Sequence, residues 1–272
     1  MSLVGYSSFV ITTAKDAREP SLWLELRRAL VRVAAPFLLV GTVTVLLGLL
    51  VTKVLDGTAF EHGDAALDRT LAAHRTPLGV TLTHIGTMFA ETPTIVALTV
   101  VAAVALRVAY RRWRESVFLV LCVAGQALIF LVTTLLIDRH RPPVPHLDAS
   151  PPPSSFPSGH TAAATAFYGG LAIVLAWHTR HRWLRWLLGA FGLLMPVMVA
   201  ACRMYRGMHY PTDTAASMLM GLALLVITGR LVLFADPAHQ RSFPRHSRRR
   251  ARPTAAGSER AEQPRRGMAV GP

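Results

Sequence analysis

Charged residues are scarce in this chain. Asp, Glu, Lys and Arg make up 16% of its 272 residues, while 52% are hydrophobic. A soluble domain of this length would alternate polar and apolar faces along its helices. Residues 33–52 instead carry no charge at all, and a helix needs roughly 20 such residues to cross a bilayer. The composition therefore favours a membrane protein and argues against a soluble one.

Cysteine is also rare. Cys122 and Cys202 are the two cysteines of the sequence, and both fall in or beside apolar runs. Neither a disulfide framework nor a thiolate metal site is indicated by this number and placement. We expect both to be small packing residues, and we predict no metal ion and no other cofactor.

Lysine is nearly absent, and the sequence begins without the pattern of a cleavable signal peptide. Charges interrupt the first twenty residues, so we expect the first apolar run to be an uncleaved anchor. Two lysines, Lys15 and Lys53, stand against many arginines and abundant alanine. That bias is typical of genomes rich in G and C, and it suggests a bacterial source.

The charges that are present lie between the apolar runs. A net charge of +14 would raise the question of nucleic acid in a soluble protein. Here arginines cluster before the first run, after the second, after the fourth and after the last, which are alternate connections. The positive-inside rule then predicts an even number of spans with both ends in the cytoplasm. We expect no nucleic-acid partner, although the basic tail keeps that alternative open beside attraction to anionic lipid.

The apolar stretches and the breakers between them predict an all-α fold, a polytopic membrane bundle of six transmembrane helices. The spans are placed at residues 33–54, 92–109, 116–137, 159–177, 186–202 and 213–234. The domain organisation is a cytoplasmic or interfacial segment (1–32), the membrane domain (33–234) and a basic tail (235–272). The tail lacks apolar periodicity, so we expect it to be disordered.

The first predicted outside connection, residues 55–91, has spaced apolar residues among charges. This pattern predicts an interfacial helix followed by a turn. Three histidines lie in it, His62, His74 and His84. Histidines at a membrane surface are more often solvated than catalytic, so we assign them no chemistry.

The second outside connection brings arginines opposite a helix start. Arg139 and Arg141 end one span, and Ser158, Gly159 and His160 open the next. Free backbone amides and the helix dipole at such a start favour an anion, and the arginine fork donates two hydrogen bonds to phosphate. In the structural alternative, the serine caps the helix and the arginines anchor spans at the headgroups. This connection alone does not decide between the two.

The third outside connection favours the catalytic interpretation. It places Arg203 at the end of one span and His209 and Asp213 at the start of the next. Ionisable residues at membrane depth are costly and usually functional. Pro211 fits the first turn of the sixth helix, so we expect the Asp213 carboxylate to accept a hydrogen bond from His209. His209 could then attack phosphorus while His160 protonates the leaving oxygen.

These residues resemble the three motifs of the type 2 phosphatidic acid phosphatase family of membrane lipid phosphatases, which shares its core with the vanadium-dependent haloperoxidases. The matches are Arg141 with Pro142 for the end of the first motif, residues 157–160 for the second, and Arg203, His209 and Asp213 for the third. The resemblance covers residues 33–234. It implies an acid phosphatase/vanadium haloperoxidase-like core.

The resemblance also implies a role for each matched residue. His209 would be the nucleophile that forms a phosphohistidine, Asp213 its orienting partner, and His160 the acid that releases the leaving group. The phosphate would be held by Arg141, Ser158, Gly159 and Arg203. No metal is implied.

The sequence departs from the family pattern at two positions. Thr134 stands where the first motif has a lysine, and Cys202 stands where the third has a serine. Loss of the lysine removes one cation from the predicted phosphate pocket, which would weaken phosphate binding. Arg139 and Arg206 are candidate accessory donors that could replace it.

The sequence thus predicts a plasma-membrane phosphatase with its site facing outside and a lipid phosphate or diphosphate as substrate. Polyprenyl diphosphate, phosphatidic acid and phosphatidylglycerol phosphate are all compatible with the family. Two alternatives use the same residues: a phospholipid-binding or envelope-complex relative with little catalysis, and a phosphotransferase. The predicted partners are the substrate and the bilayer, and the oligomeric state is not readable from the sequence.

Overall fold

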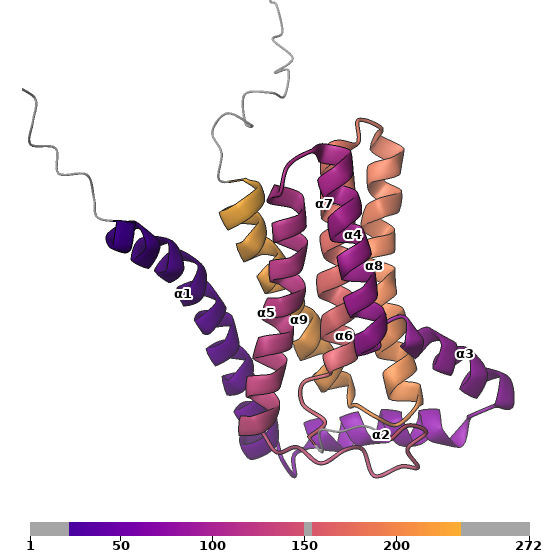
Figure 1. The fold of residues 1–272 in the computed structure, drawn as a ribbon. Coiled ribbons are helices and arrows are strands. Elements are labelled where there is room, and N and C mark those ends of the chain that lie inside the picture. The colour runs from indigo at the N-terminus through magenta and orange to yellow at the C-terminus, as the bar shows by residue number, and fades with distance from the viewer. Residues whose placement is uncertain (1–21, 150–153, 235–272) are drawn as a thin grey trace, which may run out of the picture. The chain divides into compact units, whose positions relative to one another are not determined.

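The computed structural model describes residues 22–149 and 154–234, and this part of the chain is helical, without a strand (Figure 1). Among these described residues, six segments are long and apolar enough to cross a membrane: Ala34–Val54, Thr92–Tyr110, Arg114–Leu136, Gly159–His178, Arg182–Tyr205 and Pro211–Leu233. The six predicted spans are therefore confirmed. The fifth is longer than expected, from Arg182 to Tyr205 in place of 186–202, because the helix extends past the apolar run at both ends and includes Arg182, Arg185 and Arg203.

The elements follow one another along the chain as helices with three π-helical turns. In order they are α1 (Leu22–Leu49) with η1 (Leu50–Val54), α2 (Ala59–Ala73), α3 (Pro77–Met88), α4 (Thr92–Tyr110), α5 (Arg114–Leu136), α6 (Gly159–Ala164) with η2 (Thr165–Gly169) and α7 (Gly170–His178), α8 (Arg182–Tyr205), and α9 (Pro211–Thr228) with η3 (Gly229–Leu233). The fourth span thus consists of α6, η2 and α7. Residues 1–21 and 235–272 lie outside the described residues, so the predictions for those terminal segments stay predictions.

The fourth span lies at the centre of the packing. Helices α5, α8 and α9 all contact it, and 61% of its membrane window is buried, against 17% for the windows in α1 and α4. Glycines permit close approach: a Cβ at Gly192 of α8 would lie 2.7 Å from Cβ of Ala172. Small residues at helix crossings are typical of membrane bundles, whose apolar outer surface faces lipid.

The connection 55–91 forms two helices where we predicted one helix and a turn. The second, α3, begins because Thr76 accepts a hydrogen bond at Oγ1 from the Gly79 amide (3.0 Å) and Pro77 occupies the first helical position. Figure 1 shows α2 lying across the end of the bundle at which α5 ends and α6 and α9 begin. Both α2 and α3 contact α8.

Arg75, between α2 and α3, holds the connections at this end together. Its Nε donates to the Tyr205 carbonyl (2.9 Å) and its Nη1 donates to the Pro145 carbonyl (2.7 Å). The turn between α8 and α9 passes through Gly207, whose φ of 74° is costly for other residues. A Cβ at Gly207 would also lie 2.8 Å from Val144. The connections that carry the predicted site residues are therefore packed against one another.

Candidate active site

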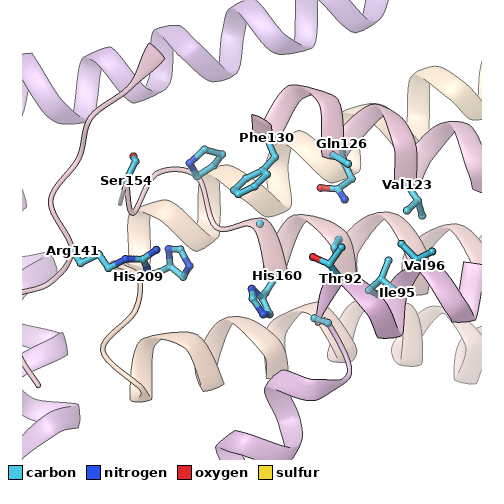
Figure 2. Close-up of a pocket in the computed structure, with 15 residues that line it drawn as sticks. Thr92, Ile95, Val96, Val123, Gln126, Phe130, Arg141, Ser154, His160 and His209 are labelled. Atoms are coloured by element: carbon cyan, nitrogen blue, oxygen red, sulfur yellow. The ribbon is translucent and has the colours of Figure 1, made fainter. Parts of the chain in front are cut away.

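A pocket at this end of the bundle contains several of the predicted residues. Arg141, His160 and His209 line it, together with Ser154, Pro157 and Gly159. Its other walls come from α4 and α5: Thr92, Ile95, Val96, Val123, Gln126, Ala127 and Phe130. Figure 2 shows Arg141 and His209 towards one end, Val123 and Val96 towards the other, and His160 between them. The pocket thus joins a basic, histidine-rich end to a largely apolar one.

Helix α6 begins at the pocket because Gly159 allows it to approach α5. A Cβ at Gly159 would lie 2.9 Å from the Phe130 ring, so any other residue would displace the helix start or the ring. His160 follows in the first turn of α6 and lines the pocket. Gly159 and His160 therefore lie at the start of a helix, as the sequence predicts.

Ser158 precedes α6 and is fully buried. Its Oγ lies 3.0 Å from the hydroxyl of Thr161, and its amide donates to Oγ of Ser217 on α9 (2.7 Å). Ser158 occupies the N-cap position of α6, but its side chain makes no capping hydrogen bond to the helix backbone. Its amide therefore links the start of α6 to α9, and the role of its hydroxyl in holding phosphate stays a prediction.

His209 is buried just before α9, and a main-chain carbonyl fixes its orientation. Nδ1 lies 2.7 Å from the carbonyl oxygen of Ser155. Because a carbonyl can only accept, Nδ1 carries the proton and Nε2 keeps its lone pair in the neutral ring. Burial lowers the pKa of His209 well below its ordinary value, and the charges of Arg203 and Arg141 lower it further. A neutral imidazole with a free lone pair is what a nucleophile requires.

The hydrogen bond expected between His209 and Asp213 is absent from the structure. Nδ1 of His209 lies 3.9 Å from the nearer Asp213 oxygen, which is too long for a hydrogen bond. Both oxygens of this carboxylate have other partners. Oδ2 accepts a hydrogen bond from the Tyr210 amide (2.9 Å), which caps the start of α9, and Oδ1 forms an ion pair with Arg139. Asp213 therefore holds the start of α9 and places a negative charge near the ring.

Arg203 is buried in the last turn of α8, with 2% of its surface exposed. One terminal nitrogen, Nη1, donates to Asp148 Oδ2 (2.8 Å) and to the hydroxyl of Thr87 (3.2 Å). Within the described residues, Nε and Nη2 have no hydrogen-bond partner. Buried donors are rarely left unsatisfied, so two N–H groups of a fixed guanidinium are available for an anion.

Arg141 joins the connection before α6 to the turn before α9. Its Nη1 donates to the Met208 carbonyl (2.6 Å), next to His209, and the side chain lines the pocket. Burial lowers the pKa of Arg141, but an arginine stays charged at neutral pH. A cation is therefore held beside the imidazole of His209.

The three candidate accessory residues are engaged elsewhere. Thr134 turns its hydroxyl back to its own helix, to the carbonyls of Phe130 (3.1 Å) and Leu131 (2.9 Å). Arg139 pairs with Asp213 and Asp64 and stacks over the Tyr210 ring, 4.2 Å from its centroid. Arg206 pairs with both oxygens of Asp148. Neither arginine lines the pocket, so replacement of the missing lysine by one of them stays a prediction.

Sequence analysis missed three residues that position the site. The Ser155 carbonyl orients His209, while Asp148 and Thr87 hold Arg203. Asp148 and Ser155 lie in a connection without periodicity, where no sequence signal points to them. Gln126 was also missed, although an amide inside an apolar span is itself a signal. Among the residues that the structure describes, no group of three or more His, Cys, Asp or Glu could hold a metal ion, and freedom from metal stays a prediction.

Comparison with known proteins finds one matching family model and similar phosphatases. Residues 115–235 match the family model described as PAP2 superfamily. Phosphatidylglycerophosphatase B of Bacillus subtilis (strain 168) is 25% identical over 190 residues, which cover 66% of this chain and 88% of that protein. Undecaprenyl-diphosphatase BcrC of the same organism is 33% identical over 106 residues, which cover 38% of this chain and 49% of that protein.

A solved structure supports the fold. The crystal structure of a transmembrane PAP2 type phosphatidylglycerolphosphate phosphatase from Bacillus subtilis matches with a TM-score of 0.64 at 20% identity, over 76% of this chain and 98% of that one. The membrane-spanning bundle of this chain thus shares its fold with a transmembrane phosphatase. Over residues 115–235 the chain is similar to the PAP2 superfamily.

Proposed function

We propose that this protein hydrolyses a lipid phosphate or diphosphate at the outer face of the plasma membrane, through a phosphohistidine on His209. The observation that carries the proposal is the state of His209. Its Nδ1–H is held by the Ser155 carbonyl and its ring lines the pocket, so that Nε2 is free to attack. His160 and Arg141 line the same pocket, and the charge of Arg203 acts on the His209 ring.

The reaction has two steps. In the first, Nε2 of His209 forms a bond to the terminal phosphorus, the bond from that phosphorus to the lipid alcohol or lipid monophosphate oxygen breaks, and a protonated His160 gives its proton to that oxygen. In the second, water attacks the phosphohistidine, His160 takes a proton from that water, and the nitrogen–phosphorus bond breaks to release inorganic phosphate. The same two rings thus serve both steps.

Arg203 and Arg141 would stabilise the negative charge on the phosphoryl oxygens during both transfers. The Nε and Nη2 groups of Arg203 lack partners within the described residues, and its Nη1 is fixed by Asp148. Preorganised donors of this kind stabilise a transition state without reorganisation at the moment of reaction. The backbone amide of Gly159, at the start of α6, is the third proposed donor.

The site end of the bundle is proposed to face outside. The α4–α5 and α7–α8 turns lie at the opposite end in Figure 1, and they carry Arg111, Arg112, Arg180 and Arg182. The positive-inside rule places such turns in the cytoplasm. A substrate would then enter from the outer leaflet through the apolar walls of the pocket. The relatives' names support a phosphatidylglycerol phosphate or an undecaprenyl diphosphate as the kind of substrate.

One observation favours a second candidate, a relative that binds phospholipid with little turnover. Thr134 replaces the expected lysine, and neither Arg139 nor Arg206 lines the pocket in its place. Transfer of the phosphoryl group to another lipid or sugar is chemically equivalent to hydrolysis and would use the same residues. An added alcohol acceptor that lowers phosphate release as a phosphorylated product forms would identify transfer.

The test is release of inorganic phosphate by the purified protein in detergent, with a chelator present. The panel contains phosphatidic acid, phosphatidylglycerol phosphate and a polyprenyl diphosphate, and the control is the His209→Ala variant. We expect release from at least one lipid by the wild type and a loss of at least roughly 1,000-fold in the variant, because the nucleophile is removed. If the wild type releases phosphate from none of these lipids, the result would favour a phospholipid-binding protein with little turnover.

A further inference from the structure

Gln126 is a buried amide in the wall of the active-site pocket. It lies in the middle of α5, with 4% of its surface exposed, and it lines the pocket between Val123 and Phe130. Within the described residues, its Oε1 is buried without a hydrogen-bond partner. Such a group is costly inside an apolar span unless a ligand or water satisfies it. The proposed mechanism gives this amide no role.

The position of Gln126 relative to the phosphate end follows from the packing of α5 on α6. The Phe130 ring lies against Gly159 at the start of α6. Gln126 is four residues earlier in α5, one helical turn or roughly 6 Å deeper into the span. Figure 2 shows Gln126 beyond Phe130 and His160 as seen from Arg141, on the side of Val123. Further in, the walls are apolar: Val123, Ile95 and Val96.

Glycerophospholipid phosphates and polyprenyl diphosphates present different chemical groups at the depth of Gln126. In a glycerophospholipid, glycerol oxygens and acyl ester carbonyls follow the phosphate within a few bonds, before the hydrocarbon begins. In a polyprenyl diphosphate, the hydrocarbon begins directly after the phosphate oxygen. A buried amide one turn from the phosphate end suits a glycerophospholipid, because the NH2 group of the amide can donate a hydrogen bond to an ester carbonyl. The two ends of a glutamine amide exchange by a simple rotation, so either can face the ligand.

We propose that Gln126 hydrogen-bonds to an acyl ester carbonyl of the substrate and makes the enzyme prefer glycerophospholipid phosphates over polyprenyl diphosphates. This inference rests on the proposed function and names the substrate class of the same site. Gln126 is a specificity residue, since it contacts a part of the substrate remote from the bond that breaks. A site built to hydrogen-bond one substrate group discriminates against analogues that lack it, because its own polar group is then left unpaired.

The experiment compares three substrates in mixed micelles: diacyl phosphatidic acid, its dialkyl ether analogue, which lacks the ester carbonyls, and farnesyl diphosphate. The variant is Gln126→Met, which keeps the size of the side chain and removes its hydrogen bonds. The control is Val123→Met, which alters the same wall without a polar group. We expect the wild type to prefer the ester over the ether by about tenfold in kcat/KM. Gln126→Met should bring that ratio close to one, because the ester rate falls with the lost hydrogen bond and the ether rate rises once no amide is left unpaired, while Val123→Met keeps the ratio.

The outcomes separate this inference from the proposed function. An ester-to-ether ratio near one in the wild type, or the same ratio in Gln126→Met, would overturn the inference while phosphate release still supports the proposed function. A wild type that hydrolyses farnesyl diphosphate faster than the diacyl lipid would also overturn it. No release from any lipid would overturn both. A wild-type ratio near one overturns the inference even where the variant does not fold.

Discussion

Single residues at this site are held by partners that the sequence pattern does not show. The matched family residues were all found near the predicted helix ends, because helix boundaries follow from apolar runs and from Pro211 at the start of α9. Their partners could not be read in the same way. Asp213 was expected to orient His209, but its carboxylate caps α9 and pairs with Arg139, and the Ser155 carbonyl takes its place. A main-chain carbonyl leaves no mark on sequence composition.

Asp148 is the partner whose loss should be most informative. It accepts hydrogen bonds from Arg203 and from Arg206. Burial alone would raise the pKa of Asp148, but the hydrogen bond from Arg206 and the charge of Arg203 outweigh it and hold that pKa below its ordinary value. Asp148 is therefore ionised at neutral pH and fixes the guanidinium of Arg203.

We expect Asp148→Asn to lower kcat/KM by about tenfold and to weaken inhibition by inorganic phosphate, because Arg203 loses a charged partner. Initial rates and phosphate inhibition constants would be compared with those of Asp138→Asn, which changes an exposed aspartate of the same connection. Equal behaviour of the two variants would show that Asp148 does not position Arg203.

At the scale of elements, the spans were predictable and the short helices between them were less so. Hydropathy identifies a helix that crosses lipid. The boundary between α2 and α3 depends instead on a local cap at Thr76 and Pro77, which the overall apolar spacing of residues 55–91 obscured. Close packing between helices depends on glycines whose partners come from distant parts of the chain.

Two glycines of α8 offer a matched test of that packing. A Cβ at Gly192 would lie 2.7 Å from Ala172, whereas a Cβ at Gly189 would meet nothing within 4 Å. We expect Gly192→Ala to destabilise the protein by about 1–3 kcal/mol through overpacking. Gly189→Ala should be neutral or stabilising, since alanine favours helix. Thermal unfolding in detergent measures both, and similar midpoints for the two variants would contradict the packing described here.

Helix α2 carries a carboxyl group that links the stability of this region to pH. Asp68 is 1% exposed, and within the described residues neither of its oxygens has a hydrogen-bond partner. Burial, with the charges of Asp64 and Asp213, raises the pKa of Asp68 from 3.8 to about 7. The folded chain therefore holds a proton that the unfolded chain has lost between pH 4 and pH 7. Stability should fall as pH rises through this window and level off above it.

We expect Asp68→Asn to remove this pH dependence. The variant should gain on the order of 2 kcal/mol over the wild type at pH 8, and the two should differ little at pH 4. Unfolding midpoints at both pH values would be compared, with Asp56→Asn as an exposed control. A difference between wild type and Asp68→Asn that does not change with pH would contradict the assignment.

At the scale of the whole molecule, the distribution of arginine predicts how the bundle sits in the membrane. The arginine-rich turns and the site connections lie at opposite ends of the spans. Single cysteines at Asp56 and His181, both exposed, would report on the two ends, because Cys122 and Cys202 are buried. We expect a membrane-impermeant maleimide to label Asp56→Cys in intact cells. It should label His181→Cys only after the cells are permeabilised. The reverse pattern would place the site in the cytoplasm.

The central claim is that His209 carries the phosphoryl group during turnover. The most direct measurement is to quench the wild-type protein during hydrolysis of a lipid whose phosphate is radiolabelled, and to map the label by peptide analysis under alkaline conditions, in which phosphohistidine survives. The account predicts an acid-labile label on His209 that is absent from His209→Ala. Turnover without a labelled enzyme, or a label on another residue, would contradict it.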